Sequence, residues 1–547
     1  MWCWLKRSVH RMHKDQRGNV ILLFLLALIP LLAGVAVAMD LGYYLVVKRN
    51  LANALDAAVL AVGNKSSLIT VDGDGNPIPA QQAAANAFAR SYIYANYPYS
   101  QTLEGAGKLT FTVIATEAEV MIDAVATIDT IFLPVLQLIG ASAADLDTLD
   151  VIVSTKAARG QINLEVFLAL DNTGSMGSSG DDSCGNPPCT KLDNLKDAAN
   201  AMLDVFFGTG DTSDNIRIGL VPFSGAVNIG TDKQGIGWLD ETRLSSVHSE
   251  NLDWSAPPPG VNNIFDLYDQ IDNAQWGGCV RARTEDFDVS DDPPDILSPD
   301  TLWTPYFAPD EPDDPGPNGP YTNNYLSDGD FAGTPEAIQA NMSKYADSTA
   351  SGNGPNYNCV PQPIQPLTNS KSTISSAIAG MVADGYTVIP QGLAWAWRGI
   401  SPTEPFTGGV PYDDPETKKA IILLTDGANN VFSGNNNFNK GNHTAYGYPG
   451  QDSGHLGASS GSEAVDVLNA KVATLCNNIK AVGIILYTIT FQVASGSAIE
   501  TIFQNCASDQ NDPVKCPTSK CAFASSENLT DVFKEIALGL NKLRLAE

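Results

Sequence analysis

Basic residues and histidine are scarce in this sequence. The 547 residues include 32 Lys and Arg against 61 Asp and Glu, which gives a formal net charge of −29. Such a surface repels phosphate backbones, so nucleic acid is excluded as an expected partner, while cations and basic protein surfaces remain. There are only five histidines, and no pair of cysteines has zinc-finger spacing with partner histidines. A structural zinc site is therefore not expected.

Motifs of common enzymes are missing as well. No phosphate-binding loop of the Gly-x4-Gly-Lys-Ser/Thr form occurs. The run Gly174-Ser-Met-Gly177 resembles part of a nucleophile elbow, but Thr173 stands where that motif needs its first glycine. A hydrolytic metal centre would require additional carboxylate or histidine ligands and a general base, and the sequence shows no such residues near these motifs. We therefore expect a binding protein and not an enzyme.

Charge is also absent from one long apolar run near the N-terminus. Val20 to Met39 contains no charged residue, and thirteen of its 20 residues are Val, Ile, Leu or Phe. This length fits one bilayer crossing, and the thirteen contribute about −4 to −8 kcal/mol to insertion. Residues 1–19 hold five basic residues against two soon after the run, which predicts a cytoplasmic N-terminus and an exported body. The five are Lys6, Arg7, Arg11, Lys14 and Arg17.

A cleaved signal peptide is the alternative interpretation, because Ala36-Val-Ala38 matches a small-residue cleavage site. The apolar run is longer than the roughly 7 to 15 residues of a signal-peptide core. A helical pattern also continues beyond it to Gly63. We therefore favour a single transmembrane helix over residues 20–39 that extends as one long helix. In both interpretations the body is exported.

Eight of the nine cysteines lie in the exported part, and only Cys3 precedes the apolar run. An even number suits disulfides in an oxidising compartment, with buried free thiols as the alternative. Two pairs are close enough in sequence to be local loop staples: Cys184 with Cys189, and Cys516 with Cys521.

Residues 40–155 are expected to form the helical extension and a small α+β neck domain. The segment 81–94 is rich in alanine and predicts a helix, while 109–114 and 119–124 have the β-rich composition of strands. Asp72-Gly-Asp-Gly-Asn76 resembles the start of a calcium loop, but the later Gly and bidentate Glu are missing, so a plain turn is preferred.

From residue 156 to 547, apolar strands alternate with amphipathic helices. This order predicts an α/β domain with a doubly wound, mostly parallel sheet covered on both faces. The expected strands are 164–170, 216–223, 420–424 and 484–491. The expected helices contain Leu192 to Met202, Leu468 to Ile479, and Leu529 to Leu540.

The alternation of strands and helices is interrupted at about residues 230–370, which predicts a long insertion there. Its segment 285–320 contains eleven acidic residues and no Lys or Arg. One interpretation is a solvated loop, and the other is a partner-specific surface grown beside the site.

Oxygen-bearing side chains follow two of the expected strands. Asp171, Thr173 and Ser175 come after the first, and Asp426 after the third, where ligand sites gather in parallel sheets. Thr387 opens the run Thr-Val-Ile-Pro-Gln-Gly392. The set resembles the metal-ion-dependent adhesion site of von Willebrand factor A domains, with threonine at position 173 where serine is usual. That resemblance implies a bound Mg²⁺, or Mn²⁺ or Ca²⁺, whose coordination is completed by a carboxylate of a partner protein.

The resemblance extends beyond the site. Arg17-Gly-Asn19 before the apolar run, then Asp40 and an Ala-rich helix, resembles TadE/TadG-type N-termini. The runs 221–228, 391–398 and 424–429 resemble TadG-type proteins of bacterial tight-adherence (Flp pilus) systems. The resemblance implies a pilus assembly or scaffold protein, held by one helix in the bacterial inner membrane with its body in the periplasm. The resemblance also implies that it binds pilus-machinery components through the metal. A pilin-like structural component and a cell-surface adhesin are the alternatives.

Overall fold

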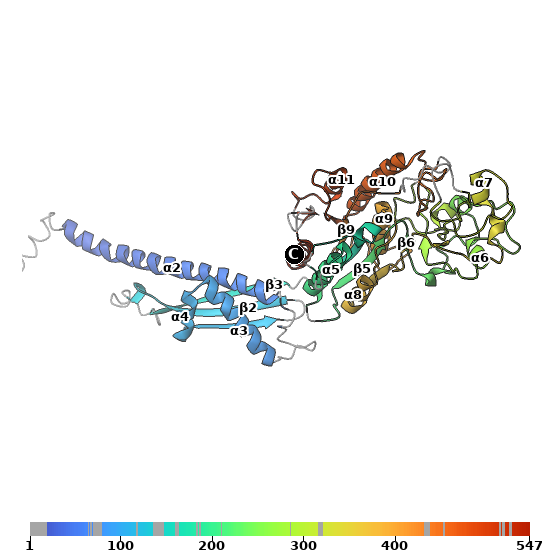
Figure 1. Cartoon of the computed structure of the whole chain (residues 1–547). Coiled ribbons are helices and arrows are strands. Elements are labelled where there is room, and N and C mark those ends of the chain that lie inside the picture. Colours follow the sequence, from blue (N-terminus) through green and yellow to red (C-terminus); the bar gives the residue numbers. More distant parts are fainter. Residues whose placement is uncertain are drawn as a thin grey trace, which may run out of the picture. The chain divides into compact units, whose positions relative to one another are not determined.

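A computed structural model describes residues 19–546 except 64, 66–67, 69–78, 116–118, 135–146, 159–162, 182–183, 185–187, 209, 285, 315–320, 432–437, 452–453, 513–515, 517–519 and 524–527. The chain divides into two compact units, residues 1–161 and 162–547, each with its own core (Figure 1). The basic segment 1–18 and the turn expected at 72–76 lie outside the described residues.

The N-terminal unit begins with one continuous helix, α2 (Asn19–Gly63). It runs through the expected membrane segment and the extension after it, so the expected single long helix is confirmed. Its part from Pro30 to Gly63 is long and apolar enough to cross a membrane by length and composition. Apolar side chains near its start, such as Leu31 and Leu32, are exposed, whereas Leu51 and Leu55 further on are buried.

The rest of this unit is a small antiparallel sheet with helices packed on it. Its strands are β1 (Leu109–Ala115), β2 (Glu119–Asp129) and β3 (Thr148–Ala158), in that spatial order, and its other helices are α3 (Pro79–Asn96) and α4 (Tyr99–Gly105). The buried Asp40 of α2 accepts hydrogen bonds from three successive backbone N–H groups, of residues 131 to 133, at 2.6–3.0 Å. These bonds tie α2 to the end of β2.

The C-terminal unit contains a six-stranded sheet in the order β11-β10-β9-β4-β5-β8. The four expected strands are β4 (Asn163–Asp171), β5 (Ile216–Phe223), β9 (Thr417–Thr425) and β10 (Ile485–Thr490), and all are parallel. At the edges lie β11 (Ala522–Phe523), which is parallel, and β8 (Gln365–Thr368), which is antiparallel. The expected α/β fold class, with a mostly parallel sheet covered by helices, is confirmed.

Helices cover both faces of this sheet (Figure 1). On one face lie α5 (Lys191–Phe207), α8 (Lys371–Ala379) and α12 (Leu529–Ala546); on the other lie α9 (Ile389–Ile400), α10 (Gly461–Ala481) and α11 (Ala498–Cys506). Side chains of β4 alternate between the two cores, with Leu168 on the first face and Phe167 on the second. Thr190 starts α5 through a capping box with Asp193.

Two glycines allow α9 to lie close to the sheet. A Cβ at Gly392 would meet the ring of Phe223 at 2.3 Å, and one at Gly399 would meet Phe167 at 2.3 Å. The two positions are about two helical turns apart and therefore share one face of α9. Any larger residue there would push the helix away from the strands.

The insertion packs against the outer side of α9 and has a core of its own aromatic residues. It contains β7 (Cys279–Val280), α6 (Ile264–Tyr268) and α7 (Pro335–Ala340), and β7 pairs with β6 (Val227–Asn228), which directly precedes the insertion. Its acidic segment is held by two buried arginines, Arg283 and Arg398, whose guanidinium groups donate to backbone carbonyls between residues 287 and 301. The interpretation as a solvated loop is therefore wrong for residues 301–312, which are buried, whereas other residues of the segment, such as Leu297, are exposed.

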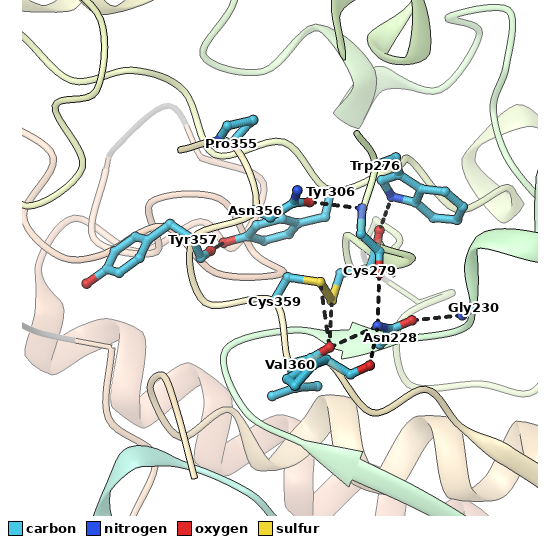
Figure 2. Close-up of a disulfide and its surroundings, with 12 residues drawn as sticks. Asn228, Gly230, Trp276, Cys279, Tyr306, Pro355, Asn356, Tyr357, Cys359 and Val360 are labelled. Atoms are coloured by element: carbon cyan, nitrogen blue, oxygen red, sulfur yellow. Dashed lines mark hydrogen bonds between the residues drawn. A yellow bond between two sulfur atoms is a disulfide. The ribbon is translucent and has the colours of Figure 1, made fainter. Parts of the chain in front are cut away.

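The described part of the chain contains four disulfides. The structure pairs Cys184 with Cys189 and Cys516 with Cys521, the two local pairs, and also Cys279 with Cys359 and Cys476 with Cys506. Figure 2 shows the disulfide that joins β7 to the returning end of the insertion. Beside it, the Asn228 side-chain amide donates to the carbonyls of Gly277 and Val360, both at 2.9 Å. The disulfide thus links the interior of the insertion to its returning end, and Asn228, just before the insertion, donates hydrogen bonds to both places.

Candidate metal centre

The candidate metal ligands lie at the carboxyl edge of the sheet, between two central strands. Asp171 is the last residue of β4, and Asp426 directly follows β9. The two strands pair in parallel up to Leu170 and Leu424, so their carboxyl ends lie side by side. Ligands in open α/β sheets gather at this edge. The apolar runs that make both strands buried therefore also bring the two carboxylates to one place.

Asp171 is fully buried and accepts two short hydrogen bonds. One carboxylate oxygen accepts from the backbone N–H of Thr173 at 2.9 Å, and the other from the hydroxyl of Thr425 at 2.6 Å. Burial, and after it the charge of Asp426, raise the pKa of Asp171 to about 6. The two carboxylates are thus near enough to repel each other, which is a property of sites that attract a cation.

Hydroxyl groups connect the remaining ligands. Thr173 and Ser175, at the start of the short 3-10 helix Gly174–Gly177, have their hydroxyl oxygens 3.0 Å apart. The Ser175 hydroxyl donates to one oxygen of Asp426 at 2.6 Å. The ammonium group of Lys191 lies 2.9 Å from the other oxygen of Asp426. The structure therefore connects four of the five expected residues through a chain of hydrogen bonds.

Thr387, the fifth, reaches this edge through its loop. Its backbone exchanges two hydrogen bonds with Asn430, at 2.9 and 3.1 Å, just beyond Asp426 in the chain. Two residues earlier, the carbonyl of Gly385 accepts the N–H of Gly174 at 3.0 Å. The loop that carries Thr387 thus lies against both of the other site segments.

The insertion borders the same loop. The hydroxyl of Ser224 donates to the carbonyls of Asp384 and Tyr386, at 2.6 and 3.2 Å. Gly385 has φ of +75°, and a Cβ there would meet the Ser224 hydroxyl at 2.3 Å and the side chain of Asn358 at 3.4 Å. Asn358 precedes the disulfide-bonded Cys359. Glycine at 385 therefore allows the site loop to pack against the returning end of the insertion.

The donor set fits a hard divalent cation. Two carboxylates and three hydroxyls offer only oxygen, which Mg²⁺ prefers, and the neutral hydroxyls leave the ion's charge uncancelled. Among the described residues, no group of three or more His, Cys, Asp or Glu side chains could hold a metal ion. A metal at this edge would therefore depend on hydroxyl ligands as well as on Asp171 and Asp426.

Sequence reasoning missed two residues of the cluster. Thr425 immediately precedes Asp426, so its place at the end of a buried strand was a usable signal. Lys191 lies far away in sequence, at the first position of α5, and nothing in the local pattern assigns its side chain to the site. Only the three-dimensional fold brings its ammonium group to Asp426.

These features define a class: an α/β sheet domain with an oxygen cluster at its carboxyl edge, in a chain whose N-terminus is a long apolar helix. Residues 18–65, which include all of α2, match the Tad family model, described as Flp pilus-assembly TadE/G-like. The N-terminal region is thus TadE/G-like. No curated protein matches the chain.

Solved structures that resemble the chain include three with low identity. The vWF domain of the type V pili tip protein Mfa5 from Porphyromonas gingivalis is 9% identical, with 70% of this chain and 96% of that chain covered and a TM-score of 0.31. The PilB minor pilin from Streptococcus sanguinis is 12% identical, with 80% of this chain and 78% of that chain covered and a TM-score of 0.30. The proximal thread matrix protein 1 from the mussel byssus is 12% identical, with 69% of this chain covered and a TM-score of 0.27. The chain spans only 46% of the mussel protein. At such scores these similarities carry no argument about function.

Proposed function

We propose that this protein is a membrane-anchored assembly or scaffold protein of a tight-adherence pilus, which binds a partner protein through a metal ion held at the carboxyl edge of the sheet. The observation that carries the proposal is the convergence of Asp171, Ser175 and Asp426 from separate parts of the chain. The match of residues 18–65 to the Tad family supports the pilus context.

The ligands would be Asp171, Thr173, Ser175, Thr387 and Asp426, and the ion Mg²⁺, with Mn²⁺ or Ca²⁺ as alternatives. When bound, the ion supplies an electron-poor centre that accepts a carboxylate from the partner. Thr425 holds Asp171 in place through its hydroxyl. Ser175, the exposed member of the cluster, lies on the side from which a partner would approach. The protein binds and does not catalyse.

The proposed placement in the cell follows from α2. Residues 20–39 span the inner membrane, because the exposed apolar side chains there need lipid or protein cover. The basic residues of 1–19 hold the N-terminus in the cytoplasm, so the neck (40–155) and the sheet domain (156–547) are periplasmic. The four disulfides suit that oxidising compartment.

Replacing both carboxylates tests the metal role. In cells that lack the native protein, Asp171→Ala with Asp426→Ala is expected to abolish pilus assembly and partner capture, while Asp204→Ala, on the exposed side of α5, retains both. Purified chains in detergent micelles would show Mg²⁺ binding by calorimetry for the wild type and the control only. Intact pili and partner capture with the double variant would overturn the metal role.

A pilin-like structural component is the second candidate. The observation in its favour is that α2 continues from an exposed apolar part into a part packed on the small antiparallel sheet. In that case the protein would co-purify with sheared filaments. Its absence from carefully sheared filaments of wild-type cells would exclude the candidate.

A further inference from the structure

Lys191 extends from the first turn of α5 into the candidate metal centre. Its ammonium group lies 2.9 Å from an oxygen of Asp426, and the side chains are 15% and 0% exposed. The other oxygen of Asp426 accepts the Ser175 hydroxyl at 2.6 Å. Both oxygens of this carboxylate are therefore occupied by donors of the chain itself.

We propose that Lys191 is a tethered cation that neutralises Asp426 in the metal-free protein and competes with the divalent ion for this carboxylate. The inference rests on the proposed metal role of Asp426. It adds regulation to that role: the ion must displace the ammonium group, so the protein captures its partner only above a threshold metal concentration.

Electrostatics makes the two cations exclusive. An ion that coordinates Asp426 beside Ser175 would lie within a few ångströms of the Lys191 ammonium group, where unscreened like charges repel strongly. Without either cation, Asp426 would be a buried carboxylate beside the equally buried Asp171. Asp426 is thus expected to have one cation beside it, either the Lys191 ammonium group or the divalent ion, but not both at once.

The backbone of Lys191 is fixed while its side chain can leave. Its N–H donates to the carbonyl of Ser178 at 3.0 Å, and the preceding Thr190 forms the capping box of α5. The lysine side chain has four rotatable carbons and is partly exposed, so it can turn to solvent without any change of the fold. Lys196, on the same helix, donates to the carbonyl of Ala379 instead and provides a matched control.

The test is Mn²⁺ titration of the full chain in detergent micelles, followed by calorimetry and by the paramagnetic signal of free Mn²⁺. Lys191→Met is expected to bind Mn²⁺ at least tenfold more tightly than the wild type. The same variant should have a lower melting temperature in chelator, because Asp426 then lacks its counter-charge. Lys191→Arg, which keeps the charge, and Lys196→Met should not gain affinity.

The outcomes separate this inference from the metal role. If the wild type and Lys191→Met bind Mn²⁺ equally, Lys191 does not compete and the metal site stands. If neither the wild type nor any variant binds Mn²⁺ although all are folded, both the proposed metal site and the proposed competition by Lys191 are wrong. If only Lys191→Met binds, and Asp426→Ala added to it removes the binding, the inference is supported in its strongest form.

Discussion

The disulfide between Cys279 and Cys359 is expected to be the largest single covalent contribution to the stability of the sheet domain. It closes a loop with a sequence separation of 80, whereas the pair Cys516–Cys521 has a separation of 5. The loop-closure model gives about 4.5 kcal/mol for the first and about 2 kcal/mol for the second. Replacing Cys279 and Cys359 by serine should therefore cost about 2.5 kcal/mol more than replacing the other pair.

Urea unfolding of the full chain in detergent, followed by tryptophan fluorescence, measures this difference. Six of the eight tryptophans lie between positions 238 and 397, in the insertion and α9, so the signal reports on the affected region. The double serine variant at 279 and 359 should have the lower midpoint. Equal losses for the two pairs would refute the reasoning, because closure of the longer loop would then contribute no more to stability than closure of the shorter one.

Three further predictions follow from other contacts. The raised pKa of Asp171, about 6 against an ordinary 3.8, means that the folded state holds this proton more tightly, so its contribution to stability is present at low pH and is lost as pH rises through 6. Unfolding of the metal-free protein should thus require about 1 kcal/mol more at pH 5 than at pH 7, and Asp171→Asn should lack that increment. Arg398→Met removes a buried donor from three backbone carbonyls and should lower the unfolding free energy by about 3 kcal/mol. The control Arg243→Met, at an exposed position, should change the unfolding free energy by less than about 1 kcal/mol. Equal urea midpoints for the two variants would contradict this prediction. Partner capture should weaken with salt, and Asp286→Asn with Asp314→Asn should reduce that dependence if the exposed acids of the insertion contact the partner.

Most of the sheet could be predicted because its central strands are buried on both faces. The four parallel strands β4, β5, β9 and β10 have near-continuous apolar runs, which are typical of such strands. The edge strands β8 and β11 could not be predicted. They are only four and two residues long and have no apolar run, and their position depends on the neighbouring strand.

The candidate site could be predicted only where it follows those strands. Asp171 and Asp426 stand at strand ends, so sheet topology alone brings them together. Lys191 belongs to a helix that returns to the same edge, and its contact with Asp426 spans 235 positions. Lys191 is simply the first residue of a capped helix, and nothing in that pattern indicates which way its side chain points, which is why its contact with Asp426 was found only in the fold.

The acidic composition of the insertion also misled, because several of its carboxylates are buried acceptors inside the fold. Asp310 accepts from the backbone N–H groups of Tyr325 and Leu326, and backbone carbonyls elsewhere in the insertion accept from arginines. All twelve residues of α9 are buried, which is expected of a helix with a second layer outside it. That layer is the insertion, which Arg398 of α9 holds by its backbone. Thr387 lies just before the other end of this helix. The insertion therefore helps to hold the site loop in place. Removing residues 285–314 as a block would uncover α9 and perturb the metal centre, so substitutions of single exposed acids are the sharper test of partner contact.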